Sequence, residues 1–196
     1  MDNKPKFNKR MYNTISLAPM VRMNTLPFRE LCASNGADFV FTEEIIDRKL
    51  IWCKRVENKE LGTIDFVSVR DQVVPLRIRE SEKSKLILQI GSNNAHWAVK
   101  ATELVQNDIC GVDVNMGCPM KFSTSGGMGA ALMNDLENAK TIMKALKHNF
   151  GHKISISCKI RVLDNFEETL NFITTLQNET GIDFISVHPR TKAEKS

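Results

Sequence analysis

The stretch Ile154-Ser155-Ile156-Ser157-Cys158-Lys159-Ile160-Arg161 alternates between apolar and polar side chains. Successive side chains of a β-strand point to opposite faces, so the apolar residues share one face and the serines, Lys159 and Arg161 share the other. A face that carries two cations cannot pack beneath helices without partners, but it can point into the open mouth of a barrel. The stretch therefore predicts a strand of a parallel barrel with a polar inner face.

Further short apolar runs predict other strands, and helical patterns lie between the later ones. Strands are expected at residues 14–18, 38–41, 85–90, 111–114, 154–160 and 183–187. The clearest helix has Asp135 as its N-cap and an apolar face formed by Leu136, Ala139, Ile142, Met143 and Leu146. Similar stripes are formed by Ala98, Ala101, Leu104 and Val105, and by Phe166, Leu170, Ile173 and Leu176. The alternation predicts an α/β fold with a parallel sheet.

Polar residues close several of the predicted strands, namely Gln89, Asn115 and His188. Polar groups at the carboxyl ends of parallel strands are typical of the active site of a TIM (β/α)8 barrel, which favours the barrel over an open doubly wound sheet. A complete barrel takes about 250 residues, and only six strands are visible. We therefore expect a TIM-type barrel truncated after about six strands, with a barrel domain at residues 14–196 and an N-terminal extension at residues 1–13.

Residues 52–82 depart from the alternating pattern. This segment carries many charges and contains Pro75, and such segments usually connect elements at the surface. We expect a solvated loop between the second and third strands of the barrel.

Composition places few limits on function. The net charge of +4 with 26% charged residues is too weak a basic excess to identify RNA as a partner. The five cysteines form no CxxC pair, so neither a metal site nor a disulfide framework is expected. The sequence shows no signal-peptide core and no apolar run long enough to span a membrane, and we expect a cytoplasmic protein without a membrane partner.

The segment Asp113-Val114-Asn115-Met116-Gly117-Cys118-Pro119 carries the clearest chemical signal. A strand delivers Asn115 to the barrel mouth, Gly117 permits a sharp turn and Pro119 stiffens the exit, so Cys118 should be held on an active-site loop. A glycine-rich stretch follows at residues 126–129. It forms neither a dinucleotide-binding nor a P-loop pattern.

Five motifs in order resemble those of the tRNA dihydrouridine synthases. They are Ala18-Pro19-Met20, the predicted turn Gln89-Ile90-Gly91, the segment from Asn115 to Pro119, Lys159-Ile160-Arg161, and Val187-His188-Pro189-Arg190-Thr191. The resemblance covers residues 14–191. Residues 21–27, 42–44 and 126–132 resemble the eukaryotic branch of the family that modifies the tRNA D-loop.

The resemblance implies an FMN-dependent reduction of uridine to 5,6-dihydrouridine in tRNA, with NADPH or NADH as reductant. Cys118 would be the catalytic proton donor to C5 of the base, and a fixed cation at Lys159 would stabilise reduced flavin. The other cofactor-binding residues implied are Ala18, Pro19, Met20, Gln89, Asn115 and His188. Arg161 and Arg190 would bind the cofactor phosphate or the tRNA backbone.

Two features depart from the family pattern. Pro189 replaces the usual glycine after His188, which removes a backbone donor, and the strands that commonly carry the phosphate site are not among the six. We therefore expect these 196 residues to bind FMN poorly. Two alternatives stay open: a related FMN barrel that acts on a free pyrimidine, and a truncated, non-catalytic RNA-binding remnant.

Overall fold

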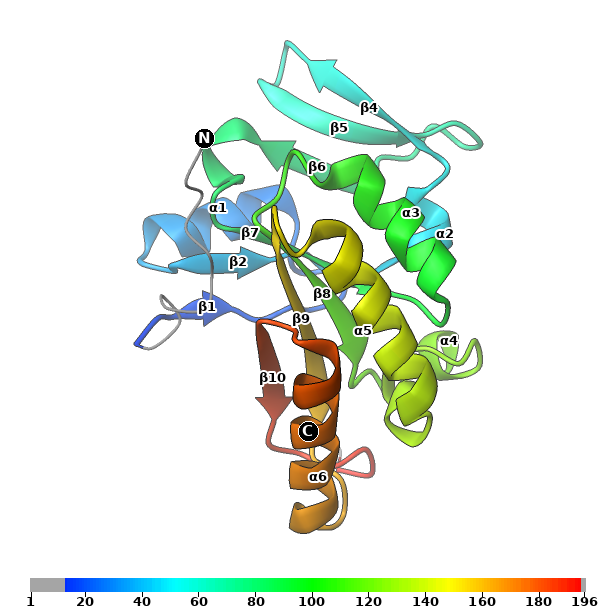
Figure 1. The fold of residues 1–196 in the computed structure, drawn as a ribbon. Helices are drawn as coiled ribbons and strands as arrows, with labels where there is room; N and C mark the ends of the chain where they lie inside the picture. Colours follow the sequence, from blue (N-terminus) through cyan, green and yellow to red (C-terminus); the bar gives the residue numbers. More distant parts are fainter. Residues whose placement is uncertain (1–12, 195–196) are drawn as a thin grey trace.

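The computed structural model describes residues 13–194, and all six predicted strands are present in it. Their bounds are β1 Ser16–Leu17, β2 Phe39–Phe41, β7 Leu86–Gly91, β8 Gly111–Met116, β9 Ser155–Arg161 and β10 Phe184–His188. They lie side by side in that order, and each pairs in parallel with the next. The sheet curls into half of a TIM-type barrel (Figure 1), which confirms the predicted fold class. Of the predicted N-terminal extension, residues 1–12 lie outside the described residues.

Helices cover the outer side of this sheet. The long ones are α1 Leu26–Ser34, α3 Ala95–Val105, α5 Leu136–Phe150 and α6 Phe166–Thr180, and shorter ones are α2 Asp47–Leu50, α4 Lys121–Thr124, η2 Glu80–Glu82 and η3 Gly129–Asn134. Helices α3, α5 and α6 pack side by side in chain order (Figure 1). Asp135 caps α5 as predicted, because its side chain accepts a hydrogen bond from the backbone N–H of Asn138.

The half-barrel has two apolar clusters, one on each face of its sheet. The larger lies between the outward faces of the strands and the helices, and it includes the predicted faces of α3 and α5. The smaller contains Phe39, Phe41 and Ile87, with Phe184 packed against it. Phe41 pairs in register with Ile87, and Phe184 pairs with Ser157 of the inner face. The cluster therefore lies on the opposite face of the sheet from the larger cluster and fills the interior below the polar end of the strands.

The predicted apolar stripe of α6 is only partly correct. Phe166 and Leu170 are 78% and 49% exposed, whereas Thr169 and Phe172 are buried with Leu176. Thr169 faces inward because its hydroxyl accepts a hydrogen bond from the backbone N–H of Leu163 and donates one to a backbone carbonyl. Because its hydroxyl is hydrogen-bonded, Thr169 can occupy a position in the core. Apolar periodicity alone predicts its apolar neighbours there instead.

The prediction of a solvated loop at residues 52–82 is wrong. This segment forms a separate antiparallel sheet of β4 Cys53–Asn58, β5 Thr63–Ser68 and β6 Leu76–Arg79, which lies beyond α2 and α3 in Figure 1. Its charges are paired: Arg77 makes two hydrogen bonds to Asp65, at 2.7 and 2.6 Å. Phe66 and Ile78 are buried in the main core. Another short strand, β3 Ile45–Ile46, pairs with β7 beyond the end of β2.

No helix among residues 13–194 combines the length and the apolar character needed to cross a membrane.

Candidate active site

The inner face of the sheet carries polar residues in layers toward the carboxyl ends of the strands. Gln89 pairs in register with Asp113, which pairs with Ser157. One step further along, Asn115 pairs with Lys159. Residues paired across neighbouring strands lie about 4.8 Å apart and point to the same side. The strand register therefore gathers these predicted site residues at one end of the half-barrel.

Asp113 is the centre of the lower polar layer, and it is fully buried. Its carboxylate accepts hydrogen bonds from Gln89 Nε2 at 2.8 Å and from Ser157 Oγ at 2.7 Å. Burial raises the pKa of Asp113 to about 6, although both hydrogen bonds and the charge of Lys159 oppose this rise. This carboxylate supplies a buried negative charge beneath Lys159.

The rim above this layer is cationic. Lys159 is partly buried and makes no hydrogen bond or ion pair with any residue in the range 13–194. Burial lowers the pKa of Lys159, the Asp113 carboxylate opposes this, and the charge of Arg161 lowers the pKa further. Burial also lowers the pKa of His188, and the charges of Lys159, Arg161 and Arg190 act in the same direction, so His188 is neutral near pH 7. The four predicted residues therefore lie close enough to act on one another.

Arg161 also stabilises the site through hydrogen bonds to the backbone. Its Nε donates to the backbone oxygen of Gly117 at 2.9 Å, and its Nη1 donates to that of Thr191 at 2.9 Å. The side chain thus ties the end of β9 to the Cys118 loop and to the segment after β10. A contact with phosphate or tRNA stays a prediction for Arg161 and for the exposed Arg190.

The loop that carries Cys118 is fixed by hydrogen bonds. Asn115 Oδ1 accepts from the backbone N–H groups of Gly117 at 2.9 Å and of Cys118 at 3.0 Å, which is an Asx-type turn. The Cys118 carbonyl in turn accepts from the N–H of Ala130 at 2.9 Å. Asn115 therefore positions the thiol through its oxygen, a role that sequence analysis did not assign to it.

The Cys118 thiol lies beside two groups that sequence analysis missed, Glu44 and Ser123. Glu44 follows β2, and its Oε1 accepts a hydrogen bond from Ser123 Oγ at 3.3 Å. Burial raises the pKa of Cys118, the Glu44 carboxylate raises it further, and the Met120 N–H and the Ser123 hydroxyl oppose the rise. Cys118 is therefore a thiol and not a thiolate at neutral pH, which suits a proton donor.

Two glycines make room for this cluster. A Cβ at Gly91, which ends β7, would lie 2.6 Å from Glu44 Oε1. A Cβ at Gly129 would overlap Ser123 Oγ and lie 2.6 Å from the Cys118 carbonyl oxygen, and Gly129 also has a φ of +58°, which side chains disfavour. Gly91 lies in a strand and not in the predicted turn.

The segment Ala18-Pro19-Met20 follows β1 directly, as predicted. Asn24 Nδ2 donates to the carbonyls of Ala18 and Phe41, both at 2.8 Å, and joins this segment to the end of β2. Met20 is 40% exposed. These contacts place the segment at the same end of the sheet as the polar layers.

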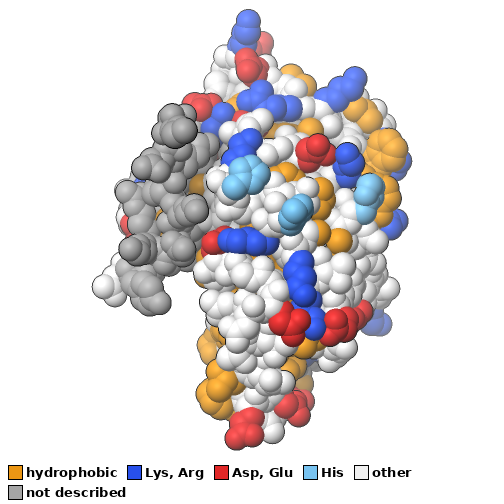
Figure 2. Space-filling view, in the orientation of Figure 1, with side chains coloured by type: hydrophobic (Ala, Val, Ile, Leu, Met, Phe, Trp, Pro, Cys, Tyr) orange, Lys and Arg blue, Asp and Glu red, His pale blue; other side chains and the backbone are white. Residues whose placement is uncertain are grey.

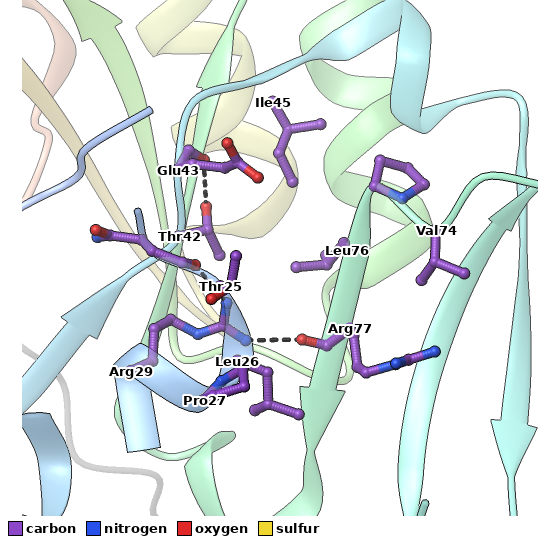
Figure 3. Close-up of a pocket in the computed structure, with 12 residues that line it drawn as sticks. Thr25, Leu26, Pro27, Arg29, Thr42, Glu43, Ile45, Val74, Leu76 and Arg77 are labelled. Carbon is purple, nitrogen blue, oxygen red and sulfur yellow. Dashed lines mark hydrogen bonds between the residues drawn. The ribbon is translucent and has the colours of Figure 1, made fainter. Parts of the chain in front are cut away.

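A separate pocket of about 210 Å³ opens beside the N-terminus of α1. Figure 3 shows Thr25, Pro27, Glu43 and Leu76 among its lining residues. None of the predicted site residues lines this pocket. The pocket therefore flanks the candidate site on the side of β2 and β6 and does not contain it.

The surface agrees with the weak charge signal of the sequence. On the face drawn in Figure 2, basic and acidic side chains are interspersed. Within residues 13–194, no three of the histidine, cysteine and acidic residues cluster as metal ligands would. All five cysteines are free thiols.

Comparisons with known proteins agree with this geometry. The dihydrouridine synthase (Dus) family model matches residues 16–196. A Schizosaccharomyces pombe protein named tRNA-dihydrouridine(20) synthase is 42% identical over 184 residues, which cover 91% of this chain and 38% of that relative. The Saccharomyces cerevisiae protein of the same name is 43% identical over 182 residues, covering 89% and 47%. Both names include NAD(P)+. The chain thus spans less than half the length of these relatives.

Proposed function

We propose that this chain, which belongs to the dihydrouridine synthase family, provides the catalytic half-barrel of an enzyme that reduces uridine to 5,6-dihydrouridine in the D-loop of tRNA. The relatives at 42% and 43% identity are named for this reaction on tRNA. In this chain the proton donor is Cys118. A cytoplasmic location stays a prediction.

The observation that carries the proposal is the state of Cys118. The thiol is held on a loop that Asn115 and Arg161 fix in place, and it is kept protonated by burial and by a neighbouring carboxylate. Saturating the C5–C6 bond of uracil requires a proton at one carbon, and an acid must still carry that proton when the transition state forms. A positioned, protonated thiol meets this requirement.

We further propose that FMN is the cofactor and that NADPH or NADH reduces it. Lys159 makes no hydrogen bond or ion pair among residues 13–194, and burial outweighs the attraction of the Asp113 carboxylate. Such a half-buried cation is destabilising unless a further anionic group approaches it. Lys159, His188, Gln89, Asn115 and the segment Ala18-Pro19-Met20 would hold the cofactor. When bound, the flavin would supply the reducing equivalents.

Each of these residues then acts by position or charge. Lys159 would stabilise negative charge on the bound ring system, and neutral His188 can offer a hydrogen bond without adding a second positive charge. Asp113, beneath Lys159, limits the excess of positive charge at the rim. The inner apolar cluster of Phe39, Phe41 and Ile87 excludes water from below the site.

The gene that encodes this chain provides the test. Its deletion should abolish dihydrouridine in the D-loop of tRNA, as mapped by mass spectrometry. Re-expression of the wild-type gene should restore it, whereas a gene encoding Cys118→Ala should not, despite equal protein levels. Cys53→Ala, which changes a buried thiol in β4, is the matched control and should restore the modification. Normal dihydrouridine in the deletion strain would refute the proposed substrate, and reduction of free uracil by the purified protein would favour the free-pyrimidine alternative.

A further inference from the structure

Glu44 is buried beside Cys118, and one of its oxygens lacks a partner. The side chain is 9% exposed. Oε1 is bonded to Ser123, but Oε2 has no hydrogen-bond partner among the described residues. The Cys118 thiol and the Asn115 amide lie close enough to favour the ionised carboxylate, yet neither makes a hydrogen bond to Oε2. An unsatisfied carboxylate oxygen in a buried site is destabilising, so this atom requires a proton or a donor.

We propose that Glu44 is the positioning residue for Cys118: its buried carboxyl group holds the thiol in the protonated form between turnovers and returns the proton that the thiol gives up. The inference rests on the proposed function and deepens it. Glu44 lies in the loop between β2 and β3, and Ser123 lies in α4. The two residues are 79 positions apart in sequence and both lie beside the thiol.

The proton transfers balance without any further reactant. The S–H bond of Cys118 breaks as a C–H bond forms at C5 of the base, which leaves a thiolate. The Glu44 carboxylate then takes a proton from water, passes it to the sulfur and is left again as a carboxylate beside the thiol. Burial raises the pKa of Glu44, and a thiolate beside it would favour protonation further. Glu44 can therefore carry the proton when the thiolate forms.

The groups around the thiol act on it in opposite directions. Glu44 is the charged group beside Cys118, and it disfavours the thiolate. Ser123 and the Met120 N–H are neutral donors that favour the thiolate. Arg161 binds the carbonyl of Gly117, one residue before the thiol. Loss of Glu44 and loss of Ser123 should therefore change the thiolate population with opposite signs.

Alkylation of Cys118 measures this population directly, because iodoacetamide reacts with the thiolate. The purified protein is treated between pH 7 and pH 10, and the peptide that contains Cys118 is quantified by mass spectrometry, with Cys32 as the internal reference. Glu44→Gln should speed alkylation at pH 8 on the order of tenfold, since a like charge beside the thiol is removed. Ser123→Ala should slow it.

Glu43→Gln is the matched control. Glu43 is the neighbouring acid, and its carboxylate accepts a hydrogen bond from the N–H of Arg22. Its side chain lies along the pocket beside α1 in Figure 3. Alkylation of Cys118 in this variant should match the wild type. Faster alkylation in both Glu44→Gln and Ser123→Ala would indicate a loosened loop and would overturn the proposal.

Complementation of the deletion strain separates this inference from the proposed function. Glu44→Gln should lose most of the dihydrouridine that the wild-type gene restores, and Glu43→Gln should keep it. Full modification with Glu44→Gln would refute the proton relay. If the deletion itself leaves dihydrouridine unchanged, the proposed function fails, while the alkylation profile still decides whether Glu44 controls the thiol.

Discussion

The buried Asp113 makes the free energy of unfolding depend on pH, and one substitution can remove this dependence. Its pKa rises from 3.8 to about 6 on folding, so the folded state binds the proton more tightly than the unfolded state. The contribution of Asp113 to the free energy of unfolding is fully present below pH 3.8 and is lost as pH rises through about 6. At 1.36 kcal/mol per unit, the loss is about 3 kcal/mol.

Asp113→Asn should therefore flatten the decrease in the free energy of unfolding between pH 4 and pH 7. The amide can still accept from Gln89, so the variant keeps part of the network. Urea titrations at pH 4.5 and pH 7 measure the effect, and Asp164→Asn, at an exposed position, should keep the wild-type slope. An equal slope in the two variants would show that Asp113 titrates as it does in the unfolded chain.

At single residues, sequence patterns predict position better than role. The alternation of residues 154–161 predicts that Lys159 and Arg161 share a face, and the strand register confirms it. The same kind of pattern also predicts that Asp113 shares the inner face, because it lies two residues before Asn115 on β8. No such pattern predicts the position of Glu44, since nothing local distinguishes it from Glu43. Only the packing of Gly91 and Ser123 decides which of the two acids reaches the thiol.

Between elements, a buried ion pair joins α1 to the segment that follows β6. Arg29 Nε and Nη2 donate to Glu82 at 2.9 and 2.7 Å, and both side chains are at most 5% exposed. Removal of one partner from a buried pair leaves an uncompensated charge and costs about 3–5 kcal/mol. Glu82→Ala should therefore lower the free energy of unfolding by about that amount.

Urea denaturation of three variants checks this prediction. Glu103→Ala breaks the exposed pair between Lys100 and Glu103 and should cost less than about 1 kcal/mol. The double variant Arg29→Met with Glu82→Leu should recover part of the loss, because no charge is left buried. A loss below about 1 kcal/mol for Glu82→Ala would mean that water reaches Arg29.

The elements that sequence analysis located are those whose signal is local. Five of the strands have apolar runs that border a turn, and α5 has a regular apolar face with a cap. The β4–β6 sheet was missed because Arg55, Asp65 and Arg77 resemble a solvated stretch. Their charges are neutralised by pairing, Arg55 with Asp108 and Arg77 with Asp65, and that pairing depends on strands and a loop distant in sequence.

Across the whole molecule, the barrel prediction depended on counting strands and on where their polar ends fall, and both features are encoded locally. Strand order places β1 and β10 at the two edges of the sheet, and the curl between them arises from the twist of successive parallel strands, which no single stretch of sequence contains. The candidate site follows from the curl, because Gln89, Asn115, Lys159 and His188 come from four separate strands.

The same architecture predicts an uneven distribution of local stability. Strand β8 has β7 on one side and β9 on the other, and all six of its residues are buried. Among residues 13–194, β10 pairs with β9 alone, and Val187 within it is 44% exposed. Local opening requires less free energy where fewer apolar contacts and hydrogen bonds must break. In hydrogen exchange followed by mass spectrometry, amides of β8 should exchange only with global unfolding, and those of β10 on the order of a hundredfold faster. Equal protection of β8 and β10 would contradict this gradient and would mean that another segment or a second copy of the chain pairs along the outer edge of β10.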